Sequence, residues 1–178
     1  MKLDPTVTPY NSLNPQYQQE SAMNPPTGLE YLLELESIKS LKHRYIRCMT
    51  LSLWDELESL LTEDAYSAYS DGKYVFEGRA ALMDFLRNQH GGEVPTSLGY
   101  WQVGMPEITL DSHSSARGLW GMYHYYLDKQ NDQQLEMFCY YEDEYRKEDG
   151  TWRISRTGYQ RVMEQSLERN GSFTLNVG

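Results

Sequence analysis

The sequence predicts an α+β fold in which helices cover one face of an antiparallel sheet. Helical periodicity is confined to the first half of the chain, and four long strand candidates follow one another in the second half. Short polar turns such as Asp149-Gly150 join these strands, which favours antiparallel pairing between neighbours. A chain of 178 residues is long enough to bury one core, so we expect a single folded domain.

The composition excludes several classes of partner. The chain has 16 Lys and Arg against 26 Asp and Glu, a formal net charge of -10, which disfavours nucleic acid and anionic membrane surfaces. No stretch approaches the roughly 20 apolar residues of a membrane span, and the N-terminus lacks the apolar core of a signal peptide. We therefore expect a cytoplasmic protein. Cys48 and Cys139 have neither metal-ligand nor disulfide spacing, and we expect no metal and no cofactor.

The chain divides into a domain with two extensions. Residues 1–26 hold five of the seven prolines and no periodic apolar pattern, so they are predicted to form a flexible tail. The domain is expected to span residues 27–165, and residues 166–178 are expected to form a C-terminal extension.

The first helix is predicted to begin after residues 27–30, which have the spacing of a capping box. A 3.6-residue repeat then gives it an apolar face over about six turns. That face is predicted to consist of Leu29, Leu32, Leu33, Ile38, Leu41, Tyr45, Cys48 and Met49.

Two shorter helices follow the first. A second capping signature at residues 52–55 leads into one, and Gly78-Arg79 opens the other, which Gly91-Gly92 are expected to end. Between them we expect a short strand near residues 65–69, a tight turn and a second short strand at residues 74–76.

The long strands are predicted at about residues 98–110, 114–128, 134–147 and 151–164. Pro106 interrupts the first of them. Because proline cannot donate a hydrogen bond to a neighbouring strand, we expect a bulge or an edge there.

Four stretches of the chain, in this order, resemble a SnoaL-like domain of the nuclear transport factor 2-like superfamily: LKHRYIRCMTLSLWDELESLLTEDA, EGRAALMDFL, GMPEITLDSHSSARGLWGM and YYEDEYRKEDGTWRISR. The resemblance covers about residues 29–162. It implies a cone, in which a strongly curved antiparallel sheet surrounds an apolar cavity and three helices cover the open side. It also implies a homodimer that pairs through the outer sheet faces.

The resemblance places this chain among proteins of varied activity. Members include scytalone dehydratase, ketosteroid isomerase, bile acid dehydratases, polyketide cyclases and the small subunits of ring-hydroxylating dioxygenases, so the fold alone does not fix the reaction. In the dehydratase-like members an aspartate ends the first helix and histidines occupy the first long strand. Here Thr50 stands in the place of the aspartate, and Trp101, Gln102 and Gly104 stand in the places of the histidines, so the usual His–Asp pair is absent.

Three residues are candidates for catalysis. Asp143 shares a strand face with Tyr141 and Tyr145, and an inward carboxylate could act as a general base, although a solvated one is the alternative. His124 could point inward, or it could be an ordinary sheet histidine. Tyr45 could donate a hydrogen bond to a ligand, or it could pack the first helix on the sheet.

The remaining candidates would line the cavity. Large rings there would select a flat or polycyclic hydrophobic ligand, or they would simply fill the space. Arg156 shares its strand face with Trp152 and Ile154, which predicts an inward guanidinium paired with a ligand or with a protein carboxylate. The predicted substrate-binding residues are Thr50, Trp54, Trp101, Trp120, Tyr141 and Arg156.

These features predict a cofactor-free enzyme of the cyclase, isomerase or dehydratase type that acts on a small hydrophobic molecule. The alternative is a binding or accessory protein that retains the pocket without the chemistry, and the absent His–Asp pair favours it. A ligand-sized open cavity supports the enzyme, whereas a cavity filled by Trp101 and the tyrosines argues against it.

Overall fold

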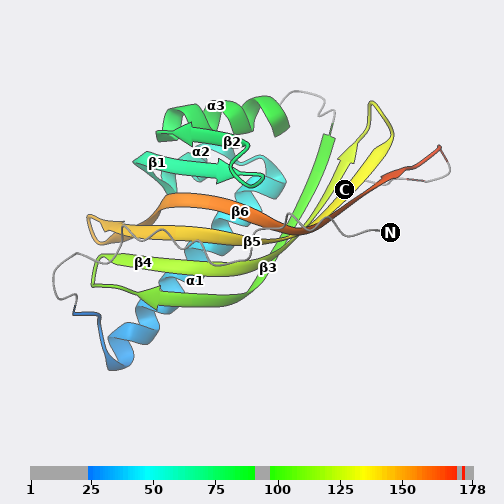
Figure 1. Cartoon of the computed structure of the whole chain (residues 1–178). Coiled ribbons are helices and arrows are strands. Elements are labelled where there is room, and N and C mark those ends of the chain that lie inside the picture. Colours follow the sequence, from blue (N-terminus) through cyan, green and yellow to red (C-terminus); the bar gives the residue numbers. More distant parts are fainter. Residues whose placement is uncertain (1–23, 91–96, 172–173, 175–178) are drawn as a thin grey trace.

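The computed structural model of the chain describes residues 24–90, 97–171 and 174. Three helices lie against a six-stranded sheet (Figure 1). This arrangement confirms the predicted α+β fold with N-terminal helices. In chain order the elements are α1 (Gly28–Leu51), α2 (Trp54–Ser59), β1 (Leu61–Tyr69), β2 (Tyr74–Glu77), α3 (Arg79–His90), β3 (Ser97–Leu110), β4 (Ser115–Asp128), β5 (Gln133–Glu148) and β6 (Thr151–Glu168).

The strands are ordered β2-β1-β6-β5-β4-β3 across the sheet. β3 to β6 form consecutive antiparallel hairpins, as their short polar turns predict. β1 pairs with the last strand, β6, in parallel, so the sheet is mixed rather than wholly antiparallel. The sheet curves without closing into a barrel, and α1 crosses its inner face (Figure 1). The inner face of the sheet therefore meets the helices in one buried core.

Pro106 causes a bulge in β3, as predicted. The pairing of β3 with β4 shifts register between Gly104 and Glu107, and Met105 in between adopts a left-handed conformation with φ of 51°. Two further register shifts interrupt the pairing of β5 with β6. One of these bulges changes which side chains of β6 face the core.

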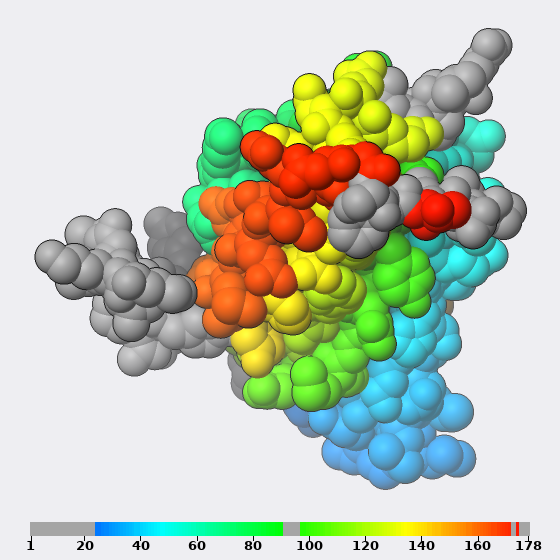
Figure 2. Space-filling view, turned by 90° about the vertical axis from the view of Figure 1, so that its right-hand side faces the viewer, coloured from blue at the N-terminus to red at the C-terminus, as the bar shows by residue number. Residues whose placement is uncertain are grey.

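The predicted apolar face of α1 is only partly buried. Leu29, Leu32 and Leu33 are 71%, 57% and 58% exposed, whereas the face is buried from Ile38 to Met49. Figure 2 shows the first turns of α1 (blue) extending past the neighbouring strands. The repeat of leucines predicts the helix correctly, but these turns project beyond the sheet that would cover them.

The two capping predictions are wrong in their side-chain contacts. Thr27 does occupy the N-cap of α1, but its side chain makes no capping hydrogen bond. Ser52 is the C-cap of α1, in a left-handed conformation with φ of 55°, and Leu53 is the N-cap of α2. The signature at residues 52–55 therefore marks a helix end as well as a helix start.

Some sequence-based predictions concern residues that the structure does not describe. Residues 1–23 of the predicted tail and the Gly91-Gly92 helix stop lie outside the described residues. At the other end, β6 continues to Glu168, past the expected end of the domain. Within the described part of the chain, no helix is both long enough and apolar enough to cross a membrane.

Candidate functional site

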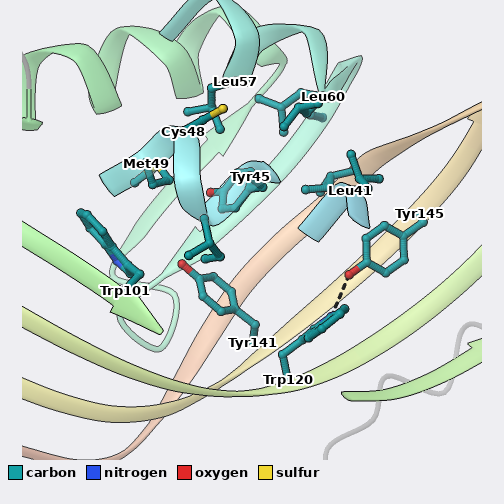
Figure 3. Packing of buried hydrophobic residues seen from close by; sticks show 14 of the residues in the cluster. Leu41, Tyr45, Cys48, Met49, Leu57, Leu60, Trp101, Trp120, Tyr141 and Tyr145 are labelled. Atoms are coloured by element: carbon teal, nitrogen blue, oxygen red, sulfur yellow. Dashed lines mark hydrogen bonds between the residues drawn. The ribbon is translucent and has the colours of Figure 1, made fainter. Parts of the chain in front are cut away.

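A buried ion pair lies at the centre of the molecule, between α1 and the inner face of the sheet. Lys42 Nζ of α1 lies 2.6 Å from Asp143 Oδ2 of β5, and neither side chain has any solvent-exposed surface. Tyr145 and Thr157 donate hydrogen bonds to Asp143, of 2.8 and 2.7 Å. The hydroxyl of Tyr145 in turn accepts a 2.8 Å hydrogen bond from Trp120 Nε1 (Figure 3).

Aromatic rings complete the surroundings of Lys42. Its Nζ lies 3.6 Å from the ring centroid of Tyr141 and 5.0 Å from that of Tyr45, distances at which ring faces attract a cation. Burial lowers the pKa of Lys42, and the charge of Asp143 opposes that shift. The carboxylate of Asp143 is inward, but Lys42, Tyr145 and Thr157 already engage both of its oxygens.

Tyr45 is also fully engaged. Its hydroxyl lies 2.9 Å from that of Tyr69 on β1, and both side chains are buried. Burial raises the pKa of Tyr45 well above its usual range, so the phenol stays protonated at ordinary pH. Tyr45 therefore packs α1 on the sheet, which was one of its two predicted roles.

Large buried side chains of the described residues occupy the interior of the cone. Its largest members lie close together in Figure 3 and are at most 6% exposed. The aromatic residues among them are Tyr45, Trp101, Trp120, Tyr141 and Tyr145. Trp101, Trp120 and Tyr141 thus fill the interior that the resemblance predicts as a cavity, and this filling argues against an enzyme whose site lies inside the cone.

A small pocket of about 60 Å³ remains at the mouth of the cone, where the ends of α1 and α3 meet β3. Thr50 comes from the end of α1, His90 from the end of α3 and Trp101 from β3. Thr50 and Trp101, which the sequence analysis pairs through the resemblance, therefore do lie in one pocket. The complete lining is Met49, Thr50, Ser52, His90, Ser97, Leu98, Gly99 and Trp101.

Trp101 is held between two histidines at this mouth. Its ring stacks on His124 at a centroid distance of 4.4 Å and an interplanar angle of 11°, and His90 meets it edge-on at 5.3 Å. Gly99 makes room for the indole, because a Cβ there would lie 2.4 Å from Trp101 Cη2. The buried indole thus belongs both to the pocket lining and to the core.

Both histidines are held in the neutral form. His124 is 7% exposed, and burial lowers its pKa to about 3. Its Nε2 atom has no hydrogen-bond partner among the described residues. Burial also lowers the pKa of His90, which unlike His124 lines the pocket. A neutral imidazole can accept a proton from a bound molecule, so His90 is the titratable group best placed to do so.

Arg156 points away from the interior, contrary to the prediction. Its guanidinium lies 4.4 Å above the ring of Tyr66 and its Nε lies 3.8 Å from Glu144. The β5–β6 register passes from Tyr145↔Ile154 to Glu144↔Arg156, so Ser155 is an extra residue that reverses the alternation. The position of a bulge of this kind cannot be predicted from an alternating apolar pattern in the sequence.

Arg156 instead lines a depression of about 230 Å³ on the outer sheet surface, with Glu142, Gln160 and six other residues. This depression is larger than the mouth pocket, but its charged side chains are exposed to water. The mouth pocket combines a buried aromatic wall with convergent polar groups, which is the usual make-up of a ligand site. Trp54, the last predicted lining residue, is half-buried against the core and does not line the mouth pocket.

Sequence reasoning missed Lys42 and His90. Lys42 lies four residues after Ile38 and three before Tyr45, so it interrupts the apolar face of α1 with a charge, which was an available signal. His90 ends α3 next to two glycines, and nothing in that pattern indicates a pocket. Within residues 24–90 and 97–171, no three His, Cys, Asp or Glu side chains group as metal ligands would.

Comparison with known proteins gives the family. The model of the SnoaL-like domain matches residues 30–158, which is well over half of the chain. The chain belongs to the SnoaL-like family. Members of this family have the cone fold of the nuclear transport factor 2-like superfamily, which the described sheet and helices also show.

Solved structures similar to this SnoaL-like chain share its fold. A candidate scytalone dehydratase from Novosphingobium aromaticivorans is 18% identical, with a TM-score of 0.67 over 76% of this chain and 89% of its own. The LinA-type3 hexachlorocyclohexane dehydrochlorinase from Novosphingobium barchaimii is 16% identical, with a TM-score of 0.68 over 85% of this chain and 100% of its own. A Mycobacterium tuberculosis protein of unknown function is 20% identical, with a TM-score of 0.64 over 83% of this chain and 80% of its own. The fold is therefore one on which small-molecule enzymes are built.

Proposed function

We propose that this SnoaL-like chain binds a small, uncharged hydrophobic molecule at the mouth pocket and catalyses lyase or isomerase chemistry there, with His90 as the proton-transfer group. The observation that carries the proposal is the convergence of His90, Thr50 and Trp101 on one pocket. Relatives with dehydratase and dehydrochlorinase names support the reaction class. No cofactor is needed for this chemistry.

The residues that line the pocket would have different roles in the proposed reaction. In an isomerisation, neutral His90 would remove a proton from a carbon next to a carbonyl and return it at another carbon. In an elimination, it would remove the proton from the carbon beside the one that bears the leaving group; the C–H electron pair would form the double bond, and the group would depart with its bonding pair. The hydroxyls of Thr50, Ser52 and Ser97 would hydrogen-bond an oxygen of the substrate. Trp101 would pack against a flat ring and keep it in the reactive orientation.

The electrostatics of the pocket favour an uncharged substrate. Among the described residues, its lining holds no carboxylate, lysine or arginine, and burial lowers the pKa of His90, which favours the neutral imidazole. An ionic substrate would lose its hydration there without gaining a partner of opposite charge. A hydrophobic ketone or phenol is the matching class.

Proton exchange tests the proposal directly. The protein is incubated in D₂O with a panel of cyclic ketones and phenols, and mass spectrometry follows deuterium entering the compound. We expect exchange with at least one compound, and at least a tenfold loss of its rate in His90→Gln. His43→Gln, on the exposed side of α1, is the matched control and should exchange normally.

A second candidate is a non-catalytic binding protein, which the filled interior favours. In this case native mass spectrometry would find a bound compound that takes up no deuterium. The same result in wild type and in His90→Gln would exclude the enzyme and support the binding protein.

A further inference from the structure

The indole of Trp101 occupies an aromatic slot beside the mouth pocket. Its six-membered ring lies over Gly99, where a Cβ would be 2.4 Å from Cη2 and 2.7 Å from Cζ3. The indole stacks on His124, and His90 meets it edge-on. Tyr126 in turn meets both imidazoles edge-on, at centroid distances of 6.1 and 6.5 Å. The aromatic slot is the space that Gly99, His90, His124 and Tyr126 bound.

Packing alone holds Trp101 in the aromatic slot. Trp120 and Trp152 are similarly buried, and each donates a hydrogen bond from its indole nitrogen. Within the described part of the chain, the indole nitrogen of Trp101 has no such partner. Trp101 also lies at the edge of the core cluster, beside Met49 (Figure 3), on the edge strand β3. Its indole is therefore the easiest of the three to rotate to another staggered position.

The mouth pocket is too small for a ring compound while Trp101 stays in place. Its volume is about 60 Å³. A protein cavity that binds benzene has a volume of about 150 Å³. Trp101 has the largest side chain in the lining, so its displacement would enlarge the pocket most. The space that it leaves already fits a flat bicyclic ring.

His124 supplies the polar group of the aromatic slot. It is buried, and its Nε2 atom has no hydrogen-bond partner among the described residues. Buried polar atoms without a partner are uncommon, because nearly all of them find one. A hydroxyl group can donate to an imidazole nitrogen or accept from it, so it suits either tautomer of His124. The unpartnered nitrogen therefore favours a ring that bears a hydroxyl.

We propose that Trp101 occupies a ligand subsite, and that a flat, uncharged, hydroxylated bicyclic ring binds there by displacing the indole from His124. The displaced indole would cover the bound ring from the solvent side. This inference rests on the proposed function for the place of the site, but it requires no proton transfer. Displacing the indole costs part of the binding free energy, so the native chain binds the ring more weakly than a chain whose slot is empty.

Fluorine NMR of the protein labelled with 5-fluorotryptophan tests the displacement, with 2-naphthol as the probe. Trp101→Phe assigns the resonance of Trp101, and the change of its chemical shift between H₂O and D₂O reports solvent exposure. We expect this change to be small in the free protein and to rise at least twofold when 2-naphthol binds. The resonances of Trp120 and Trp152 should keep their values. A probe that binds and leaves the indole of Trp101 buried would overturn the proposal.

Trp101→Ala empties the aromatic slot in advance. Calorimetric titration should find that 2-naphthol binds this variant at least tenfold more tightly than the native chain, because no indole has to leave. Trp54→Ala removes an indole that does not line the mouth pocket, and it should bind as the native chain does. Trp101→Leu is the substitute if the alanine variant does not fold. Equal affinities in the native chain and the Trp101 variant would overturn the proposal.

His124→Phe tests the polar group, because it keeps a ring for stacking and removes Nε2. We expect 2-naphthol to bind this variant at least threefold more weakly than it binds the native chain. The matched probe 2-methylnaphthalene has no hydroxyl and should bind both proteins alike. A loss shared by both probes, or by neither, would overturn the preference for a hydroxyl.

These experiments separate the ligand subsite from the proposed reaction. Displacement of Trp101 by 2-naphthol in a protein that exchanges no deuterium would support the subsite and exclude only the catalysis. Deuterium exchange without displacement of Trp101 would support the catalysis and overturn the subsite. Absence of 2-naphthol binding in both the native chain and Trp101→Ala would also overturn the subsite.

Discussion

Lys42 on α1 and Asp143 on β5 form a 2.6 Å ion pair that is sealed from solvent. Two charges are expensive to bury, and their attraction offsets that cost only when both partners are present. Tyr145, Thr157 and the ring of Tyr141 supply the remaining contacts of the pair. The pair therefore holds α1 to the sheet in one fixed position.

Lys42→Met should destabilise the protein by about 3–5 kcal/mol, because it leaves the carboxylate of Asp143 buried without a counter-charge. Urea denaturation measures the loss. Adding Asp143→Asn should recover part of it. Lys39→Met, three residues away on the same helix and partly exposed, should cost less than about 0.5 kcal/mol, and an equal cost for both lysines would contradict the role of the pair.

Tyr145→Phe should cost about 1–3 kcal/mol, because the hydroxyl links Trp120 Nε1 to Asp143 and its removal leaves a buried donor unpaired. The same denaturation experiment checks it. Tyr125→Phe removes a half-buried hydroxyl whose hydrogen bond to Gln134 is 3.3 Å long, and it should change the stability little.

The stability should fall in acid partly through His124. The imidazole has a pKa of about 6.5 in the unfolded chain and of about 3 in the folded protein. Between these values the unfolded chain binds more protons, so lowering the pH favours unfolding by about 1.4 kcal/mol per pH unit for this group. His124→Gln should flatten the pH dependence below pH 6.5. Equal slopes in wild type and in His124→Gln would show that His124 is not held neutral.

Gly99→Ala should move the indole of Trp101, because the new Cβ would lie 2.4 Å from Cη2. We expect a shift in tryptophan fluorescence, a wider mouth that takes up larger ring compounds, and a cost of about 1–3 kcal/mol. Gly104→Ala, in the same strand with nothing within 4 Å of its Cβ position, is the control. Unchanged fluorescence in Gly99→Ala would mean that the indole is not confined by this residue.

The order of helices and strands and their limits could be predicted from local patterns, because apolar periodicity and turn residues act over a few residues. The long strands begin and end within a few residues of their predicted limits. The solvent exposure of individual side chains was predicted less well than the limits of the elements. Leu29, Leu32 and Leu33 continue the apolar repeat of α1, yet they are exposed because the sheet ends before it reaches them.

The candidate site was harder to predict because it depends on contacts between distant segments. Thr50 and Trp101 were placed together through the family resemblance, and they do line one pocket. The partner of Asp143 is Lys42, about a hundred residues earlier. The charge of Lys42 on the apolar face of α1 was a signal that this residue is special, but no local pattern indicates that Asp143 is its partner. Arg156 was misplaced by a single extra residue in β6, which no local pattern reveals.

The parallel pairing of β1 with β6 has a consequence for synthesis. Leu61 finds its partner Ile154 only after most of the chain has left the ribosome, so β1 and β2 cannot join the sheet before the last strand is made. A chain that stops before residue 151 would keep its helices and the β3–β5 meander but would lose the strand that connects them. Termination shortly before residue 151, although it removes only the last strand and the residues after it, should therefore yield an insoluble product rather than a slightly shortened domain.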